Sequence, residues 1–141
     1  MKDVPINYLA VVVAIVWNMA LGMLWYGPVF GKMWKSLMGF TDESMKAMSM
    51  TPMKAMVGGV ITAFLMSFVL THDLVFASAY YGMGGVRAGM AGGFWNWLGF
   101  IVPVCAGAVL WEGKTWKLFF LNIGYWLVAL MGMGVILSVW K

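Results

Sequence analysis

The sequence predicts an all-α membrane protein with four transmembrane helices in a single domain, residues 1–141. Of its residues, 63% are hydrophobic and 10% are charged, whereas soluble domains are about 45–50% apolar and about 25% charged. A soluble domain of this size buries only about two-thirds of its surface, so lipid has to cover the remainder. A helix needs about 20 apolar residues to cross the hydrocarbon core. Four stretches meet that length: residues 6–26, 52–77, 89–111 and 117–140.

The first two spans have recognisable ends. The first span ends at Gly27-Pro28, and because no small-x-small cleavage site follows its apolar run, we interpret it as a helix and not as a signal peptide. The second span begins at Pro52, directly after Thr51. Threonine is a good N-cap, and proline suits the first helical position. These residues therefore predict a helix start at Pro52.

Three loops connect the spans. In the first loop, residues 27–51, the run Thr41-Asp42-Glu43-Ser44 predicts a short capped helix at the membrane interface. The second loop, residues 80–88, is rich in glycine and is expected to be flexible. The third loop, residues 112–116, is so short that spans three and four must be antiparallel neighbours.

The distribution of basic residues predicts the orientation, because cytoplasmic loops are enriched in Lys and Arg. Loops one and three hold more of these residues than the opposite side does. We therefore expect both termini on the non-cytoplasmic side of a cell inner (plasma) membrane. The two sets are Lys32, Lys35, Lys46, Lys54, Lys114 and Lys117 against Lys2, Arg87 and Lys141.

Several strings of residues also resemble a known family. The run from Asn18 to Pro28, with Trp25-Tyr26-Gly27-Pro28 followed by Phe30-Gly31-Lys32 and Trp34, is the most specific. The others are Trp97-Leu98-Gly99-Phe100 with Pro103, Leu110-Trp111-Glu112, Lys117-Leu118-Phe119 and Gly124-Tyr125. Together they resemble the small bacterial membrane proteins grouped as domain of unknown function 1761. The resemblance implies four membrane helices and no particular activity, and the Met-rich residues 45–56 depart from the family pattern.

Small residues recur along spans three and four. Spacings of four residues place small side chains on one helix face, where two backbones can approach closely. We interpret this pattern as helix packing, and we expect Pro103 to kink span three. Kinked, glycine-lined helices also occur in channels, so that alternative stays open. The candidate packing residues are Gly85, Gly89, Gly93, Gly99, Pro103, Gly107, Gly124 and Gly132.

Amide side chains lie inside three of the spans. Asn18, Gly22 and Tyr26 share one face of the first span, while Asn96 and Asn122 lie in spans three and four. Asn18 and Asn122 are expected at similar depth, so they can bond across helices, each bond contributing about 0.6–2 kcal/mol. The five residues form either a packing seam or the lining of a polar path or ligand site.

Two groups of ionisable residues flank the spans. On the expected outer side, the group is His72, Asp73 and Arg87, and ionisable residues at membrane depth are functional candidates. They form either a wetted surface cluster or a site that handles protons or a ligand. On the expected inner side, we interpret the second group as a charge cluster that anchors the third loop: Glu112, Lys114 and Lys117.

Methionines are concentrated before and at the start of the second span. Thioethers are soft ligands that favour Cu(I), but methionine also serves as an adaptable hydrophobe. We expect the segment to lie against lipid, and we predict neither a metal nor another cofactor; a soft-metal site is the minor alternative. The residues concerned are Met45, Met48, Met50, Met53 and Met56.

Other functional classes find no support in the sequence. One His and one Cys, Cys105, provide neither a zinc site nor a Cys–His nucleophile pair, and they permit no intrachain disulfide. The basic residues are scattered between apolar spans, which does not favour nucleic-acid binding. We therefore expect a non-enzymatic membrane protein, in contact with lipid, that self-associates or serves as an accessory subunit of a larger complex. A small channel or transporter built by a homo-oligomer is the alternative.

Overall fold

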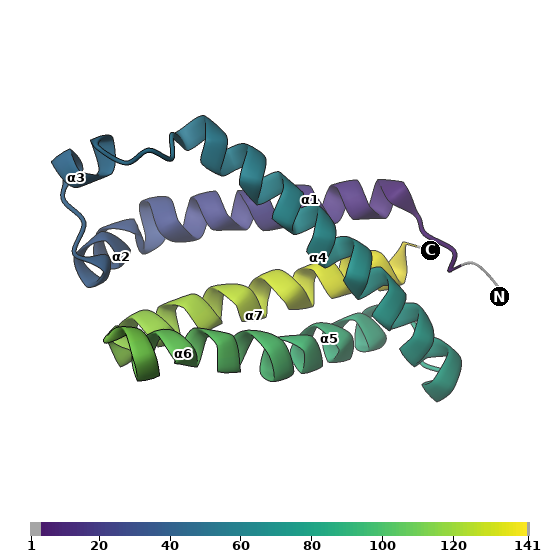
Figure 1. The fold of residues 1–141 in the computed structure, drawn as a ribbon. Helices are drawn as coiled ribbons and strands as arrows, with labels where there is room; N and C mark the ends of the chain where they lie inside the picture. The colour runs from purple at the N-terminus through teal and green to yellow at the C-terminus, as the bar shows by residue number, and fades with distance from the viewer. Residues whose placement is uncertain (1–3, 141) are drawn as a thin grey trace.

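The computed structural model describes residues 4–140, and within them every regular element is helical (Figure 1). Four continuous stretches are long and apolar enough to cross a membrane: Tyr8–Val29, Pro52–Tyr81, Gly85–Glu112 and Trp116–Val139. The all-α class with four membrane helices is thus confirmed. In chain order the elements are α1 (Tyr8–Leu24), η1 (Trp25–Val29), α2 (Gly31–Met38), α3 (Asp42–Lys46), α4 (Pro52–Tyr81), α5 (Gly85–Asn96), η2 (Trp97–Ile101), α6 (Val102–Glu112) and α7 (Trp116–Val139). The labels η1 and η2 denote π-helical segments.

Side-chain caps begin three of the long helices. The Asn7 side chain accepts hydrogen bonds from the backbone at the start of α1. Thr51 caps α4 by accepting from the Lys54 amide, and Pro52 occupies the first helical turn. Thr115 caps α7 in the same way. These oxygens satisfy amide groups that have no partner within their helix, and the start of α4 is confirmed at the predicted residue.

The second loop differs from the prediction. α4 continues to Tyr81 and α5 already begins at Gly85, so only residues 82–84 connect them, and Arg87 lies inside α5. Gly82 ends α4 in the left-handed conformation, with φ 64°, which costs glycine little. Of the later glycines expected in this loop, Gly84 does lie in the connection, whereas Gly85 begins α5. Packing of α5 against α7 outweighs the weak helix propensity of glycine there.

The first loop contains two helices where the sequence predicted one. α3 is the predicted short helix, and Thr41 and Ser44 form a capping box at its start. α2 was not predicted. It ends at Gly39, which has φ 72° and whose amide donates to the Ser36 carbonyl.

The helices form a bundle that is packed at one end and spread at the other. α7 lies between α1 and α5, and α4 crosses the bundle obliquely (Figure 1). Both termini lie at one end, here called the termini end, and α2, α3, the start of α4 and the α6–α7 turn lie at the opposite loop end. The buried core is at the termini end. It consists of Ala10, Val11, Ala14, Leu70, Leu74, Leu130, Met133 and Leu137.

The lysines of loops one and three lie at the opposite end of the bundle from Arg87. Loops one and three, with their lysines, share the loop end, and Lys35 and Asp42 form an ion pair of 3.3 Å there. Arg87 is near the termini end. The orientation prediction also used Lys2 and Lys141, which lie outside the described residues.

Candidate functional site

The candidate site begins with a widened turn where α1 ends. At Gly27 the backbone leaves the helical region, with φ −106° and ψ −107°, and Pro28 provides no amide donor. The Phe30 amide therefore donates to the Trp25 carbonyl at 2.8 Å, a π-type hydrogen bond. Gly27-Pro28 thus bends the span without stopping it, which extends the predicted first helix to Val29.

The same turn explains the next glycine. A Cβ added at Gly31 would lie 2.7 Å from the Tyr26 carbonyl oxygen, too close for any other residue at that position. The bend brings the start of α2 against the end of α1. It thereby fixes Tyr26 and Trp34 so that their rings meet edge to face, with centroids 5.7 Å apart.

Two tyrosine–asparagine pairs join the first span, α1 and η1, to α7. The Tyr125 hydroxyl donates to Asn18 Oδ1, 2.9 Å away, and this pair is buried. The Tyr26 hydroxyl donates to Asn122 Oδ1, also at 2.9 Å. Gly22 lies between them, and a Cβ there would be 3.2 Å from the Tyr125 hydroxyl oxygen. We call these five residues the phenol–amide seam.

The seam contains four residues that the sequence singled out and one that it missed. Asn18, Gly22, Tyr26 and Asn122 come together, but each asparagine bonds a tyrosine of the opposite helix, and the expected bond between the two asparagines is replaced by these pairs. Tyr125 was missed as a partner. Its spacing three residues after Asn122 places both on one face of α7, and that spacing could have identified it.

Aromatic rings surround the seam at the loop end. The Tyr26 and Tyr125 centroids are 5.1 Å apart, and those of Trp25 and Phe30 are 4.8 Å apart. The Trp25 indole nitrogen is buried without a hydrogen-bond partner among the described residues. Such ring pairs contribute about 0.5–1.5 kcal/mol beyond the area that they bury. The string Trp25-Tyr26-Gly27-Pro28 and the pair Gly124-Tyr125, both used for the family resemblance, thus meet here.

The seam's chemistry suits it to joining helices. Its phenol and amide groups are neutral, and two of its oxygens accept hydrogen bonds from the opposite helix. Within residues 4–140, no three His, Cys, Asp or Glu side chains gather as a metal site would require. The arrangement can therefore orient α1 on α7. The five residues of the seam include no His, Cys, Asp or Glu, the residue types that metal or acid–base chemistry would require.

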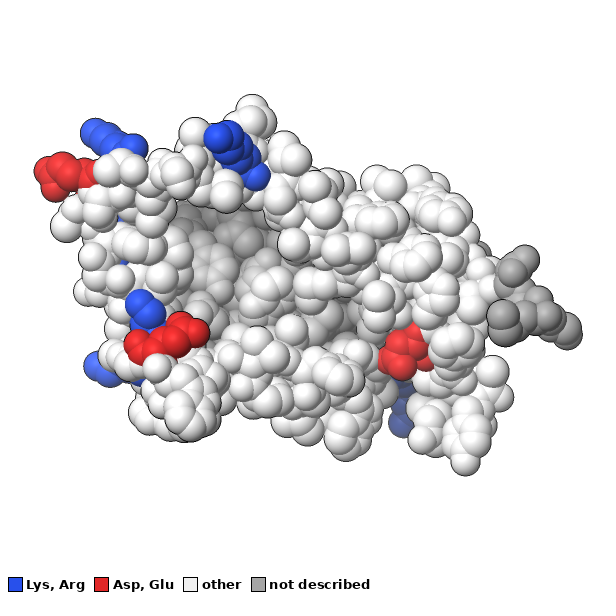
Figure 2. Space-filling view, in the orientation of Figure 1, with Lys and Arg blue, Asp and Glu red and all other residues white. Residues whose placement is uncertain are grey.

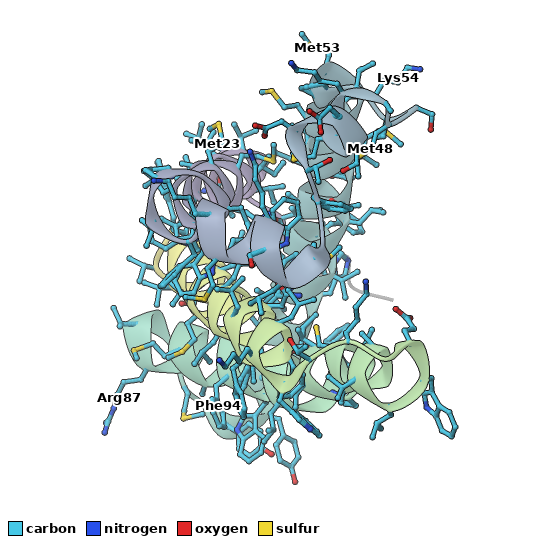
Figure 3. The ribbon with its side chains drawn as sticks, turned by 90° about the vertical axis from the view of Figure 1, so that its left-hand side faces the viewer. Met23, Met48, Met53, Lys54, Arg87 and Phe94 are labelled. Carbon is cyan, nitrogen blue, oxygen red and sulfur yellow. The ribbon has the colours of Figure 1, made fainter. Side chains whose placement is uncertain are left out.

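Asn96 is not part of the seam. Its Nδ2 donates to Asp73 Oδ2 at 2.6 Å and to the Gly92 carbonyl at 2.9 Å, joining α5 to α4. His72 instead bonds through Nδ1 to the Phe68 carbonyl of its own helix, at 2.8 Å. Arg87 points away from the bundle (Figure 3). The structure thus separates the three residues expected on the outer side and gives Asp73 an amide partner.

The second charge group sits at the α6–α7 turn. Glu112 ends α6, Lys114 lies in the turn, and Lys117 lies in the first turn of α7. None of them forms an ion pair within the part of the chain described here. The turn is instead closed by its backbone, since the Lys114 amide donates to the Ala108 carbonyl and Gly113 has φ 69°.

The small residues fall into three groups. On α5, Gly85, Gly89 and Gly93 face α7: a Cβ at Gly89 would overlap the backbone of Gly134, and the Gly85 carbonyl accepts from the Ser138 hydroxyl at 2.7 Å. On α7, Gly124 lies against Trp25 and Gly132 against Trp17. Around α6 the pattern differs, because Cβ atoms at Gly99 and Gly107 would meet nothing within 4 Å.

Pro103 lies just after η2, the widened segment of span three. Because proline has no amide hydrogen, the Gly99 carbonyl loses its usual partner, and the irregular segment begins at Trp97, two residues before that glycine. The Trp97 indole donates to the Ile123 carbonyl of α7 at 2.7 Å. This bond holds the widened segment on the bundle.

The methionine segment links α3 to α4. Met48, Met50, Met53 and Met56 are all exposed, by 40–70% of their surface. Met53 projects from the first turn of α4, close to Lys54, and Met48 lies in the connection before that helix (Figure 3). Exposed thioethers beside a lysine at a helix start suit a layer against lipid headgroups.

Comparison with known proteins gives one match. Residues 9–138 match the model of the family described as "Protein of unknown function (DUF1761)". Neither a curated protein nor a solved structure matches the chain.

Proposed function

We propose that this chain, which belongs to the DUF1761 family, is a non-enzymatic membrane subunit that associates with further copies of itself through α4 and α6. The single observation that supports this proposal is the lack of packing around span three. In the most apolar part of Gly85–Glu112 only 6% of residues are buried, against 44% in Trp116–Val139.

The unpacked surface lies at the loop end of two helices. α6 has no buried residue, and between residues 52 and 62 of α4 none is buried either. On α6, Val104 is 75% exposed and Leu110 is 62% exposed. Both helices therefore present long apolar faces that no other part of the described chain covers.

These two faces border a hollow. The first half of α4 and α6 diverge from one another toward the loop end (Figure 1), and Figure 2 shows a recess between them. Near the middle of the bundle, a cavity of about 420 Å³ lies between α4 and η2. Its lining is almost entirely apolar and includes Leu65, Met66, Phe100 and Ile101.

A second copy of the chain can fill this hollow more favourably than lipid alone can. In a bilayer, helices associate through close van der Waals packing and not through a hydrophobic drive. Glycines at a helix surface allow that close approach, and Cβ atoms added at Gly99 and Gly107 would meet nothing within 4 Å in residues 4–140. We infer that α6 of one copy enters the hollow of the other, so that two copies bury the same surfaces around a two-fold axis.

The phenol–amide seam supports the packing role over the channel alternative. A channel would show these groups to water, whereas Asn18 is 5% exposed and accepts a hydrogen bond from Tyr125. Cysteine labelling distinguishes the packing role from the channel alternative. With Cys105→Ser as background, cysteines at Asn18 and Gly22 should stay unreactive toward a membrane-impermeant thiol reagent. Rapid labelling at both positions would favour a water-filled path.

The orientation is part of the proposal. Lysines of loops one and three share the loop end, and the positive-inside rule then places that end in the cytoplasm. A reporter fused after residue 141 should be active only on the non-cytoplasmic side of the inner membrane. Activity of that fusion in the cytoplasm would contradict this orientation.

Native mass spectrometry after gentle extraction tests the association itself. We expect a discrete homo-oligomer, and a smaller oligomeric fraction for Gly107→Leu at the same concentration. Val16→Leu is the matched control, because Val16 is 60% exposed and belongs to α1, outside the two helices proposed to associate. A monomer at all concentrations would contradict the proposal. Co-purification with other subunits at fixed stoichiometry would replace it with the accessory role.

A further inference from the structure

We propose a second site, independent of the association of copies: the carboxylate of Asp73 and the rings of Trp95 and Tyr81 bind an organic ammonium or another lipophilic cation from within the membrane. The site lies between α4 and α5. Four features support it: the position of the carboxylate within α4, the groove beside it, the missing countercharge and the aromatic lining.

Asp73 lies well inside the span. It is eight residues before the end of α4 at Tyr81, which corresponds to about 12 Å along a helix. Its partner Asn96 is eleven residues after the start of α5 at Gly85, or about 16 Å. Both distances are measured from the termini end of the helix, and they are similar because Asn96 and Asp73 are hydrogen-bonded to each other. An ionisable residue inside a membrane-spanning helix is a functional candidate by default.

A groove opens beside the carboxylate. It has a volume of about 480 Å³ and lies between the second half of α4 and α5. Small residues of both helices form its walls and provide the space: Ala77, Ala88, Ala91 and Gly92. Asp73 lines the groove together with Trp95 and Tyr81. A group of organic size can therefore reach the carboxylate.

Among residues 4–140, the carboxylate has a hydrogen-bond donor but no countercharge. Asn96 donates to one of its oxygens, and the only ion pair within residues 4–140 is Lys35–Asp42 at the loop end. Arg87 precedes Asn96 by nine residues, which is half a turn out of phase on a helix of 3.6 residues per turn. Since Asn96 faces α4, Arg87 faces away, as Figure 3 shows. His72 is held by the Phe68 carbonyl on a different face of α4.

The neighbouring rings indicate the kind of cation. Trp95 and Tyr81 are 65% and 66% exposed and line the groove with Asp73. The face of an aromatic ring attracts an ammonium group. A dehydrated metal ion would need about six oxygen ligands, and the groove offers chiefly the Asp73 carboxylate and the Ser78 and Tyr81 hydroxyls. An organic cation, which requires one counter-ion and aromatic surfaces, fits this lining.

Binding of benzyltrimethylammonium to the purified full chain in detergent tests the proposal. Titration should quench tryptophan fluorescence in a saturable manner. Neopentylbenzene, the uncharged analogue with the same shape, should bind much more weakly. Asp73→Asn keeps a polar group of the same size beside Asn96 but removes the charge, so affinity should fall about tenfold or more. Trp95→Leu should weaken binding about two- to fivefold, with calorimetry as its readout.

Glu112→Gln is the matched control, since it removes one carboxylate at the far end of the neighbouring span, Gly85–Glu112, and its affinity should equal that of the wild type. Three results would overturn the proposal. These are no saturable binding by the wild-type chain, equal binding of the neutral analogue, or equal binding by Asp73→Asn. If the wild type fails to bind while Asp73→Asn dissociates an oligomer, the carboxylate is a contact between copies instead.

Discussion

The two ends of this bundle are built from the same kinds of residue but are packed differently. At the termini end, Gly89 of α5 meets Gly134 of α7 so closely that an added Cβ would overlap backbone. From the middle of the same span toward the loop end, Cβ atoms added at Gly99 and Gly107 would meet nothing within 4 Å among the described residues. In the sequence, Gly89 and Gly93 are four residues apart and Gly99 and Gly107 are eight apart, so each pair lies on one helix face. A glycine therefore stabilises the monomer only where the backbone of another helix packs closely against it.

The difference also separates two tasks. The termini end, with the core around Leu130 and Met133, stabilises the single chain. At the loop end, the phenol–amide seam holds only α1 and α7 together, while α4 and α6 stay uncovered. Substitutions at the termini end should therefore lower the stability of the chain, and substitutions around α6 should affect the association of copies.

The largest expected effect is at the close helix contact. Gly89→Leu should lower the free energy of unfolding by about 1–3 kcal/mol or more, because the side chain must push α5 from α7. Gly107→Leu, which adds the same side chain where there is room, should leave monomer stability unchanged. Thermal unfolding in detergent, followed by circular dichroism, compares the two. Equal loss of stability in both variants would contradict the contrast between the ends.

The next effect concerns the seam. Tyr125→Phe removes the donor to the buried Asn18, and we expect a loss of about 0.6–2 kcal/mol, the range for hydrogen bonds between membrane helices. Asn18→Leu should also weaken the bundle. Tyr26→Phe, whose partner Asn122 is only half-buried, should cost less than Tyr125→Phe. The reverse order in equilibrium unfolding would show that burial does not set the strength of the two pairs.

A smaller loss is expected at the far end of α7. Ser138→Ala removes the hydrogen bond of 2.7 Å to the Gly85 carbonyl but leaves the glycine contact intact. We expect a decrease of about 0.6 kcal/mol in unfolding free energy. Ser44→Ala, in the exposed capping box of α3, is the control and should not change the global transition. A loss for Ser138→Ala as large as that for Gly89→Leu would mean that the hydrogen bond, and not close packing, dominates this contact.

The smallest effect is expected in the methionine segment. Because Met50, Met53 and Met56 are exposed on the loop end, replacing all three by Leu should not change the unfolding of the chain. Calorimetric titration with Ag(I), a stand-in for Cu(I), should give no saturable heat beyond the dilution signal. Stoichiometric binding that disappears in the triple variant would instead establish a soft-metal site.

Much of the fold was predictable from local signals. Span length, the Thr51-Pro52 start and the Thr41–Ser44 capping box each depend on neighbouring residues, and the structure confirms all three. The start of α5 was not predictable in this way. Gly85 was expected in the second loop, whereas Gly89 and Gly93 already lay in predicted span three. The helix begins as early as Gly85 because α5 packs along α7, where the Gly85 carbonyl accepts a hydrogen bond from the Ser138 hydroxyl.

The candidate site was predictable by helix face but not by partner. The spacing of Asn18, Gly22 and Tyr26 identified one side of the seam correctly. Which group each of them bonds depends on the rotation of α7, and that rotation is set by contacts such as Trp97 with the Ile123 carbonyl. The same limit applies to Asp73, because its pairing with Asn96 depends on how α4 crosses α5.

Cross-linking through Cys105 in native membranes tests the central claim, the meeting of two copies at α6, most directly. It is the only cysteine of the chain and is half-buried on α6. A cross-linked dimer of this chain must therefore be joined through Cys105 of each copy. A short bis-maleimide should produce a dimer that Cys105→Ser abolishes and Gly107→Leu reduces. If a monofunctional maleimide labels Cys105 but the bifunctional reagent yields only monomer, the copies do not meet at α6.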